Sequence, residues 1–314
     1  MTETNHGTLS VVIPTYNCRP LLDRHLKHLQ TWMDLAYEII VVDSQSNDGT
    51  RTYLEEKIKH PRLQFIDRDR GLYESWNAGI SASSGDWIYL STIGDTIERE
   101  HLIKMLKQGT LAKADVVISP CRFVDEEGNS LPRTKRGNPA ILRNWGGSSF
   151  SLKPPAAKYH AYSGAGIQSL LGSCASDIFR GDFLRSRPFP TNYHTHGDVA
   201  WTLRHAHEMR LCVVPEIGST FCRHPKSEIT PKEISLETYD LMYNREITSE
   251  PYTRYFKLCQ RLRLLNQERK KHRNCSNVFQ RTLKYLHCRW LKIKIWWQRK
   301  QELKQLGEYR QDLV

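Results

Sequence analysis

The sequence lacks several features that would place it in other classes of protein. Its 314 residues contain no run of about 20 uncharged apolar residues, the length that a membrane-spanning helix needs. The first ten residues are polar and do not show the basic segment followed by an apolar one that marks a secretory signal. We therefore expect a cytoplasmic protein.

Paired cysteines are also missing. The eight cysteines are scattered and form no Cys-x-x-Cys pair. Such pairs mark many zinc sites, and dense disulfide frameworks are typical of small secreted chains. We expect buried or free thiols instead. No internal repeat is visible, so the length predicts one large domain with an appendage.

The positive net charge is confined to the end of the chain. The sequence has 46 Lys and Arg against 34 Asp and Glu, a net charge of +12. Residues 251–314 hold 17 of the basic residues and 4 of the acidic ones, which leaves 29 and 30 for the rest. The basic character therefore belongs to a C-terminal extension, and the main domain is nearly neutral.

The first 120 residues alternate short β-branched apolar runs with segments of helical spacing. The apolar runs predict strands at residues 9–16, 38–43, 63–66, 87–91 and 114–119. The intervening segments predict helices at residues 20–32, 50–59 and 98–107, and a further helix that ends at 79–83. This alternation predicts an α/β fold with a mostly parallel central sheet flanked by helices, which binds its ligand at the carboxyl ends of the strands.

The regular alternation stops after residue 120. The segment 123–131 predicts a hairpin, and 133–172 is rich in Gly, Ser, Pro and aromatic residues. We expect 133–172 to be a long irregular segment with a role in function. Regular structure is expected again at 176–179, in a helix from about residue 198, and at 211–215.

Polar residues follow the first two predicted strands. The first strand ends in Pro14-Thr15-Tyr16-Asn17, and the second ends in Asp43 followed by Ser-Gln-Ser-Asn-Asp-Gly-Thr. Adjacent strand ends can line a nucleotide crevice, where a carboxylate accepts from a base and an aromatic ring stacks on it. The same residues also fit plain turns with helix caps.

Two further blocks complete a specific pattern. Residues 69–80 read Asp-Arg-Gly-Leu-Tyr-Glu-Ser-Trp-Asn-Ala-Gly-Ile, and residues 85–95 read Gly-Asp-Trp-Ile-Tyr-Leu-Ser-Thr-Ile-Gly-Asp. In order and spacing, the four blocks resemble glycosyltransferase family two, which has the GT-A fold. The resemblance is to a bacterial polysaccharide-type subgroup that carries Asp-Lys-Gly-Ile-Tyr-Asp-Ala-Met-Asn-Lys-Gly, then Gly-Glu-Trp and Asn-Ala-Gly-Asp. It covers residues 9–120 strongly and 172–224 moderately.

The resemblance implies a nucleotide-sugar donor, with uridine as the nucleoside, and inversion at the anomeric carbon. We expect a GT-A domain at 1–230, with its donor half up to about 120 and its acceptor half at about 121–230, followed by a basic amphipathic helical extension at 231–314. The resemblance places donor contacts at Pro14, Thr15, Tyr16, Asn17, Asp43, Asp69, Arg70, Gly71, Tyr73, Asn77 and Gly94.

The family binds a divalent metal, Mn²⁺ or Mg²⁺, through acids around an Asp-x-Asp motif. The matching stretch here is Thr92-Ile93-Gly94-Asp95, which keeps one carboxylate, as the subgroup does. Mg²⁺ commonly takes one or two carboxylates together with substrate phosphates and water, so Asp95 suffices. Asp95 also fits a helix cap. His224 is the candidate for a second metal ligand, and its alternatives are His194, His196, His205 and His207.

Asp198 matches the catalytic base of inverting family members. The family has a Glu-Asp pair there, and in this chain the first position is Gly197. The base takes a proton from the acceptor hydroxyl while that oxygen attacks the anomeric carbon. A carboxylate stabilised at a helix N-terminus is the alternative. The small residues at 172–176 fall where the family places a loop against donor and acceptor, and they also fit a tight turn.

Apolar residues in the extension step by three and four: Leu283, Leu286, Trp290, Ile293 and Trp297. On a helix they form one stripe, and Lys284, Arg289 and Lys292 lie off it. A basic amphipathic helix with Trp on its apolar face predicts binding to an anionic membrane surface. Packing on the main domain and contact between protomers in an oligomer are alternatives. No nucleic-acid-binding motif accompanies the charge, so we expect no nucleic acid partner.

These features together predict a metal-assisted glycosyltransferase at the inner face of the plasma membrane. The acceptor would be a hydroxyl of a saccharide or lipid-linked saccharide in bacterial cell-surface polysaccharide or glycolipid assembly. Two alternatives remain. The reduced acidic motifs also fit a non-catalytic, membrane-associated scaffold. The second alternative is a nucleotidyltransferase. Such an enzyme usually has a glycine-rich basic loop after its first strand, and residues 14–18 of this chain, Pro-Thr-Tyr-Asn-Cys, argue against it.

Overall fold

The computed structural model describes residues 6–131, 141, 147–164, 170–223, 242, 245–247, 258, 261 and 278–313. The chain divides into two compact units, one of residues 1–247 with 311–314 and one of residues 248–310. The first unit contains both β-sheets and the predicted site.

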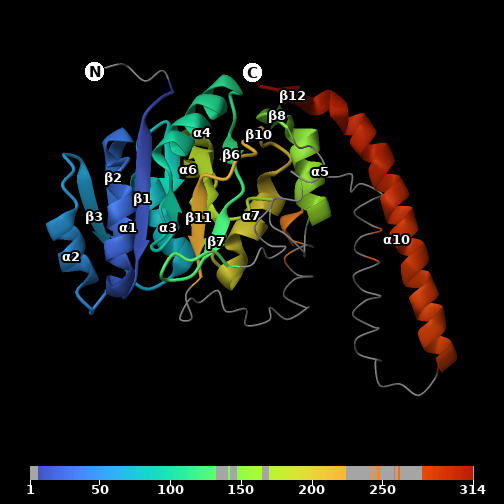
Figure 1. Ribbon diagram of the computed structural model, residues 1–314, viewed down its shortest axis with the longest axis horizontal. Helices are drawn as coiled ribbons and strands as arrows, with labels where there is room; N and C mark the ends of the chain where they lie inside the picture. Colours follow the sequence, from blue (N-terminus) through green and yellow to red (C-terminus); the bar gives the residue numbers. More distant parts are fainter. Residues whose placement is uncertain are drawn as a thin grey trace. The chain divides into compact units, whose positions relative to one another are not determined.

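A large sheet runs through the first unit with strand order β12-β8-β10-β6-β9-β4-β1-β2-β3 (Figure 1). Its strands are β1 (Leu9–Thr15), β2 (Ala36–Asp43), β3 (Leu63–Asp67), β4 (Trp87–Leu90), β6 (Val116–Ile118), β8 (Phe150–Leu152), β9 (Asp177–Arg180), β10 (Leu211–Val213) and β12 (Arg310–Asp312). β1 is parallel to β2 and β4, β2 to β3, and β6 to β10. β9 is antiparallel to β4 and β6, and β8 to β10. The predicted α/β class with a mostly parallel sheet is confirmed.

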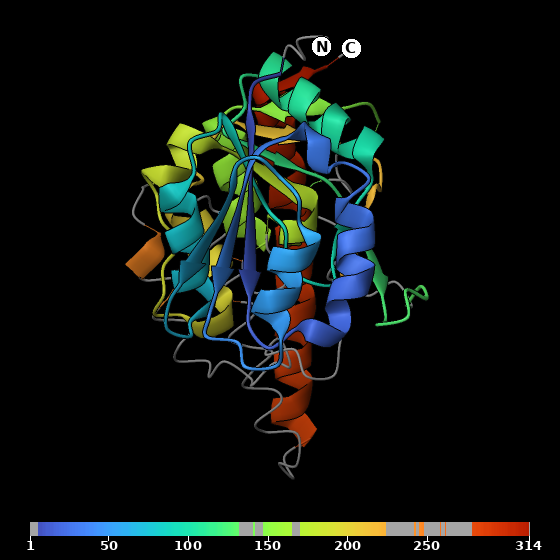
Figure 2. The same ribbon diagram turned by 90° about the vertical axis from the view of Figure 1, so that its left-hand side faces the viewer.

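Helices flank the sheet on both faces (Figure 2). They are α1 (Leu22–Leu29), α2 (Thr50–Lys57), α3 (Leu72–Ala82), α4 (Arg99–Leu111), α5 (Pro154–Gly164), α6 (Gly181–Arg185) and α7 (Gly197–His205). The predicted helices of the first half are therefore present, with ends within a few residues of those expected.

The apolar runs of the strands are explained by burial on both faces. Successive side chains of a strand point to opposite faces. Val11 belongs to the core cluster that also contains Leu26 of α1 and Leu102 of α4. Val12 faces the other way, toward α3, where a Cβ built on Gly79 would lie 2.3 Å from a Val12 methyl carbon. Both faces of β1 therefore need apolar residues, and α3 needs a glycine to approach it.

A second, small sheet has the order β5-β11-β7. Its strands are β5 (Thr96–Ile97), β11 (Ser219–Cys222) and β7 (Arg122–Val124). This sheet joins the residues directly after Asp95 to a segment more than one hundred positions later. Val124 also forms an antiparallel bridge with Ser130, which confirms the predicted hairpin at 123–131.

The prediction of an irregular segment at 133–172 is wrong for part of its length. The described residues of this segment include strand β8 and helix α5. Phe150 and Leu152 are fully buried, and Ala156 and Ala157 of α5 are buried as well. A strand of three residues is too short to show a period, and its pairing with β10 is what orders it.

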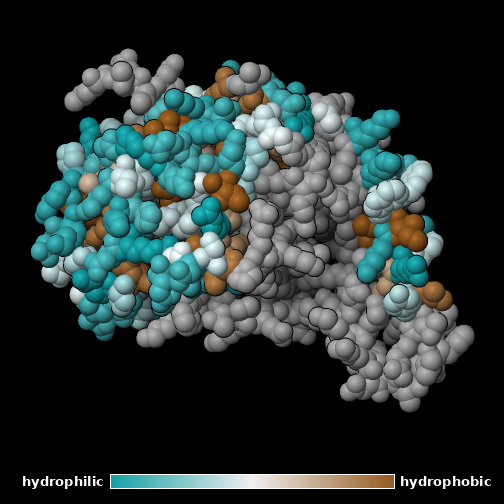
Figure 3. Space-filling view, in the orientation of Figure 1, coloured by the Kyte–Doolittle hydropathy of each residue, from teal (hydrophilic) through white to brown (hydrophobic). Residues whose placement is uncertain are grey.

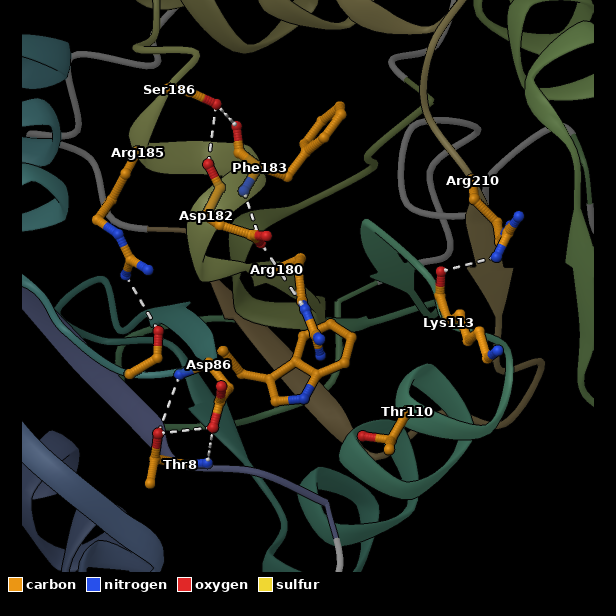
Figure 4. Close-up of polar contacts among 12 residues, drawn as sticks. Thr8, Asp86, Thr110, Lys113, Arg180, Asp182, Phe183, Arg185, Ser186 and Arg210 are labelled. Atoms are coloured by element: carbon orange, nitrogen blue, oxygen red, sulfur yellow. Dashed lines mark hydrogen bonds and ion pairs between the residues drawn. The ribbon is translucent and has the colours of Figure 1, made fainter.

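Polar contacts that hold the fold together lie at the amino ends of β4 and of neighbouring strands (Figure 4). Asp86 accepts from the backbone N–H and the hydroxyl of Thr8, at 2.8 and 2.9 Å. Arg185 donates to the carbonyl oxygen of Gly85 at 3.0 Å, and Arg210 to that of Lys113 at 3.3 Å. These groups hold strand ends together. The predicted site lies at the carboxyl end of the parallel strands.

The second unit contains helix α10 (Val278–Leu306), followed by the short turn η5 (Gly307–Tyr309). Leu286, Trp290, Ile293 and Trp297 are between 49% and 60% exposed, so the predicted apolar stripe forms an exposed face. The side chain of Leu283 lies outside the described residues. Cys288 and Leu291, which lie on the opposite side of the helix, are buried. Among the helices that the structure describes, none is both long and apolar enough to cross a membrane.

Candidate active site

The loops after β1 and β2 are held together by side-chain hydrogen bonds. Asp43 accepts from the hydroxyls of Thr15 at 2.8 Å and Ser46 at 2.6 Å, and from the backbone N–H of Ser46 at 2.9 Å. The side-chain oxygen of Asn17 accepts from the backbone N–H of Asn47 at 2.9 Å. Thr15, Asn17 and Asp43 thus lie together as predicted and shape this edge of the sheet. Their contacts with a donor stay predictions.

An exposed aromatic ring lies at the same edge. Tyr16 is 42% exposed, and the guanidinium carbon of Arg70 lies 4.4 Å from its ring centroid. Gln45 donates to the carboxylate of Asp69 at 3.0 Å. Asp69 and Arg70 follow β3, which pairs with β2, so the ends of three neighbouring strands meet here. A ring for stacking and a carboxylate for hydrogen bonding are the groups that a nucleoside base requires.

Three further predicted donor residues, Pro14, Gly71 and Gly94, are backbone positions at strand ends and turns. Pro14 precedes Thr15 at the end of β1. Gly71 is the N-terminal flanking residue of α3, and a Cβ there would lie 2.5 Å from Glu74 Oε2. Gly94 has a φ of +93°, a left-handed conformation that favours glycine. The turn before Asp95 therefore depends on the glycine of the motif.

Asp95 lies inside the molecule and does not cap a helix. It is only 6% exposed, and it accepts hydrogen bonds from the Thr92 hydroxyl and from the Cys222 backbone N–H, the latter at 2.8 Å. Burial raises the pKa of its carboxyl to about 7, although both hydrogen bonds act to lower it. Helix α4 begins at Arg99 with Glu98 as its N-cap, so the helix-cap interpretation of Asp95 is wrong.

Asp95 supplies one carboxylate for the expected metal, and its binding of an ion stays a prediction. No group of three His, Cys, Asp or Glu side chains in the described part of the chain is arranged to hold an ion. His224 lies outside the described residues. Each oxygen of the Asp95 carboxylate accepts one hydrogen bond and keeps lone pairs. One carboxylate with phosphates and water is a normal Mg²⁺ environment, whereas a closed protein cage is not formed here.

Asp198 lies in the first turn of α7 and meets Tyr73 of α3. The Tyr73 hydroxyl lies 3.0 Å from Asp198 Oδ1 and 3.2 Å from the Thr195 carbonyl oxygen. Burial raises the pKa of Asp198 above the ordinary carboxyl value, while the hydrogen bond from Tyr73 acts to lower it. A raised pKa suits a carboxylate that accepts a proton near neutral pH. The expected donor contact of Tyr73 stays a prediction, and the structure adds a contact with Asp198.

Asn77, also predicted at the donor, makes a structural contact. Its side-chain nitrogen donates to the carbonyl oxygen of Phe189 at 2.8 Å, and its oxygen accepts from the N–H of Phe189 at 2.9 Å. This pair of bonds ties α3 to the segment that leads into α7. A donor contact of Asn77 stays a prediction.

Asp177 at the start of β9 was missed by the sequence reasoning. Its carboxyl is completely buried, and among the described residues neither oxygen has a hydrogen-bond partner. Burial, together with the nearby charge of Asp198, raises its pKa well above the ordinary value. The only signal was an isolated acid directly before the apolar pair Ile178-Phe179, and no motif included it.

Cys174 shows that the acids gather in one place. This residue lies in the turn η3 (Cys174–Ser176), within the small-residue loop that precedes β9. Burial raises the pKa of its thiol, and the charges of Asp177, Asp198 and Asp95 add to that effect. All three carboxylates therefore lie near enough to this thiol for their charges to act on it. A shared catalytic site of Asp95 and Asp198 stays a prediction.

Comparison with known proteins identifies the relatives of this chain. The model of the family described as "Glycosyl transferase family 2" matches residues 10–169. The chain is 30% identical over 125 residues to the succinoglycan biosynthesis protein ExoO of Rhizobium meliloti. This match covers 39% of this chain and 36% of that protein. It is 34% identical over 203 residues to the glycosyltransferase AglE of Haloferax volcanii, which covers 62% of this chain and 60% of that protein. The chain thus matches less than two thirds of the length of either relative.

A solved structure agrees with the observed fold. The crystal structure of S. aureus TarS 1–349 in complex with UDP-GlcNAc superposes with a TM-score of 0.62 at 15% identity, and the match covers 90% of this chain and 79% of that chain. At this identity the likeness concerns the fold alone, and it confirms the GT-A fold expected from the sequence. Since the family model matches half of the chain, this protein belongs to glycosyl transferase family 2.

Proposed function

We propose that this protein is a glycosyltransferase that moves a sugar from a UDP-linked donor to an acceptor hydroxyl with inversion. The proposal is supported by the family match and by Asp95 and Asp198, whose charges both raise the pKa of the Cys174 thiol, on the domain that also exposes Tyr16 at its strand ends. A solved structure of the same fold holds UDP-GlcNAc, which supports a uridine donor. The name of the succinoglycan relative supports a role in bacterial polysaccharide assembly.

The proposed chemistry gives each of these side chains a role. The nucleoside lies against Tyr16 and Asp69, and the donor diphosphate lies at Asp95. Asp198 removes the proton of the acceptor hydroxyl as its oxygen attacks the anomeric carbon from the opposite face. The bond from that carbon to the diphosphate oxygen breaks, and the nucleoside diphosphate leaves. Asp95 would hold Mn²⁺ or Mg²⁺, whose charge stabilises the leaving phosphate.

Nucleotide-sugar binding is the direct test of this function. A ligand at 100 times its Kd stabilises the folded state by about 2.7 kcal/mol, which raises the Tm of a domain of this size by roughly 5–10 °C. We expect a UDP-sugar to produce such a rise in a thermal-shift panel, and the rise to be larger with Mn²⁺ than without it.

Two variants make the panel specific. Asp95→Asn is expected to remove the Mn²⁺-dependent part of the shift. Asp34→Asn, which changes an aspartate whose side chain is 67% exposed, is the matched control and should keep it. If no nucleotide-sugar shifts the Tm, the enzymatic proposal is wrong. That result would support the non-catalytic scaffold instead. A nucleotidyltransferase would instead release pyrophosphate from a nucleoside triphosphate.

We also propose that α10 binds the anionic inner face of the plasma membrane, where a lipid-linked saccharide acceptor would lie. Trp290 and Trp297 are half-exposed on the apolar face, and apolar and polar surface lie side by side along this helix (Figure 3). Lys294 Nζ lies 3.9 Å from the centroid of the Trp290 ring, and Lys300 Nζ lies 5.5 Å from that of Trp296. Aromatic rings beside long basic side chains are typical of interfacial helices.

Vesicle sedimentation tests the membrane proposal. We expect the protein to bind vesicles that contain phosphatidylglycerol and not vesicles of pure phosphatidylcholine, with binding that weakens as salt rises. Trp290→Ala combined with Trp297→Ala should weaken binding at least about tenfold, because each large apolar side chain that is buried contributes about 1.5–3 kcal/mol. Leu111→Ala, which removes an equally exposed apolar residue elsewhere, is the control. Concentration-dependent dimers without vesicle binding would instead support contact between protomers.

A further inference from the structure

The residue before the base is a glycine for a steric reason. The family has a Glu-Asp pair here, and this chain has Gly197-Asp198. The φ and ψ of Gly197 are −62° and −32°, an ordinary helical conformation that any residue adopts. A Cβ at this position, however, would lie 2.6 Å from two ring carbons of Tyr73 and 2.4 Å from the Pro190 carbonyl oxygen. The space that a first acid would use is therefore filled by the Tyr73 ring.

The Tyr73 ring is fixed on its other sides by aromatic packing. Its centroid lies 5.0 Å from that of Trp76 in an edge-to-face arrangement and 5.7 Å from that of Phe189 in a stacked one. The backbone of Phe189 is itself held by the two hydrogen bonds from Asn77. The ring is 3% exposed. With the ring immobilised, the position of its hydroxyl is determined by the fold.

That hydroxyl reaches the base directly. Its oxygen lies 3.0 Å from Asp198 Oδ1, and its single proton is available to this carboxylate oxygen or to the Thr195 carbonyl oxygen at 3.2 Å. In the described part of the chain, the charge of Asp198 also acts to raise the pKa of Asp177 in β9 and of Cys174 in η3. Tyr73 is distinguished from them by its contact, because its hydroxyl lies within hydrogen-bond distance of Asp198 and can donate to the ionised base.

We propose that Tyr73 is the residue that positions the base. Its ring fills the space of the missing first acid of the pair, and its hydroxyl orients the Asp198 carboxylate. This inference rests on the proposed function. The hydrogen bond directs one carboxylate oxygen toward α3. It thereby fixes the plane of the carboxylate and the position of the other oxygen. Proton transfer from the acceptor hydroxyl needs that fixed geometry. The position of Tyr73 depends on Gly197, because the lack of a side chain at Gly197 leaves room for the Tyr73 ring.

Tyr73→Phe tests the inference because it removes the hydroxyl and keeps the ring that packs on Gly197. We expect kcat to fall on the order of 10- to 100-fold, as for a modest misplacement of a catalytic group. The Kd of the nucleotide-sugar, measured without acceptor, should stay within about twofold, since the hydroxyl already has Asp198 and the Thr195 carbonyl oxygen as partners.

The pH profile separates positioning from a merely structural role. The Tyr73 hydrogen bond favours the ionised form of Asp198, so its loss should move the acid limb of the kcat/KM profile to higher pH. Tyr53→Phe is the control, because it removes a Tyr–Asp hydrogen bond to Asp23 far along the chain from the base. Neither kcat nor the pH profile should change in that variant.

Three outcomes would overturn the inference. A Tyr73→Phe protein with unchanged kcat shows that the hydroxyl does not position the base. A fall in donor affinity with unchanged kcat assigns it to the donor, and a fall in kcat without a shift of the acid limb makes its role structural. Gly197→Ala, which displaces the ring, should lower kcat non-additively with Tyr73→Phe. Failure of the proposed function is distinct, because the unmodified protein would then show no transfer at all.

Discussion

Asp198→Asn is expected to reduce kcat by about 10²- to 10⁴-fold, the usual contribution of general base catalysis. The amide cannot accept the proton of the acceptor hydroxyl, yet it fills nearly the same volume and its oxygen can still accept from Tyr73. Donor binding should therefore survive. The measurement is transfer from a UDP-sugar, together with the thermal shift that this donor produces in the same variant.

The pH dependence of the unmodified enzyme follows from the same group. Burial raises the pKa of Asp198, so its ionised, active form is lost as the pH falls through that raised value. We expect kcat/KM to decline on the acid side, starting above the ordinary carboxyl pKa of about 4. Asp182→Asn, at an aspartate whose side chain is 81% exposed, should leave transfer unchanged. Transfer by Asp198→Asn at more than a tenth of the normal rate would show that the base is another group.

Asp177→Asn is expected to stabilise the protein by an amount that grows with pH. The carboxyl of Asp177 is buried with no hydrogen-bond partner in the part of the chain that the structure describes, and its pKa in the folded state is raised well above the ordinary value. Above pH 4 the unfolded chain releases this proton while the folded protein retains it, so rising pH favours unfolding. The free energy of unfolding falls by about 1.4 kcal/mol per pH unit as long as Asp177 stays protonated.

Urea unfolding at several pH values measures this effect. The asparagine side chain at position 177 does not titrate. The gain in the free energy of unfolding over the unmodified protein should therefore be small at pH 4 and increase steadily above it. Asp95, with a pKa near 7, contributes a slope of the same sign and is present in both proteins. Asp182→Asn should show no such pH-dependent gain. A destabilised Asp177→Asn protein would mean that the buried group is ionised and has a partner in the folded state.

The positions of the candidate site residues were predictable where a local pattern marked them. Asp43 follows a buried strand, Gly94 lies in a turn that needs a left-handed conformation, and Asp95 follows that turn. The contacts of these residues were not predictable. Asp95 accepts from the backbone of Cys222, and Asn77 pairs with the backbone of Phe189. Both contacts join segments more than one hundred residues apart, and neither leaves a periodic signal in the sequence.

The sequence by itself determined the alternation of strands and helices in the first half, because burial on the two faces of β1 or one face of α1 repeats with a local period. It also determined the apolar stripe of α10 and the segregation of positive charge. Only tertiary packing brings Tyr73 to Asp198, buries Asp177 with no partner among the described residues, and assigns residues 311–313 to the first unit. These features arise from packing between segments distant in the chain, where the fold chooses the neighbour of each side chain and no local pattern records it.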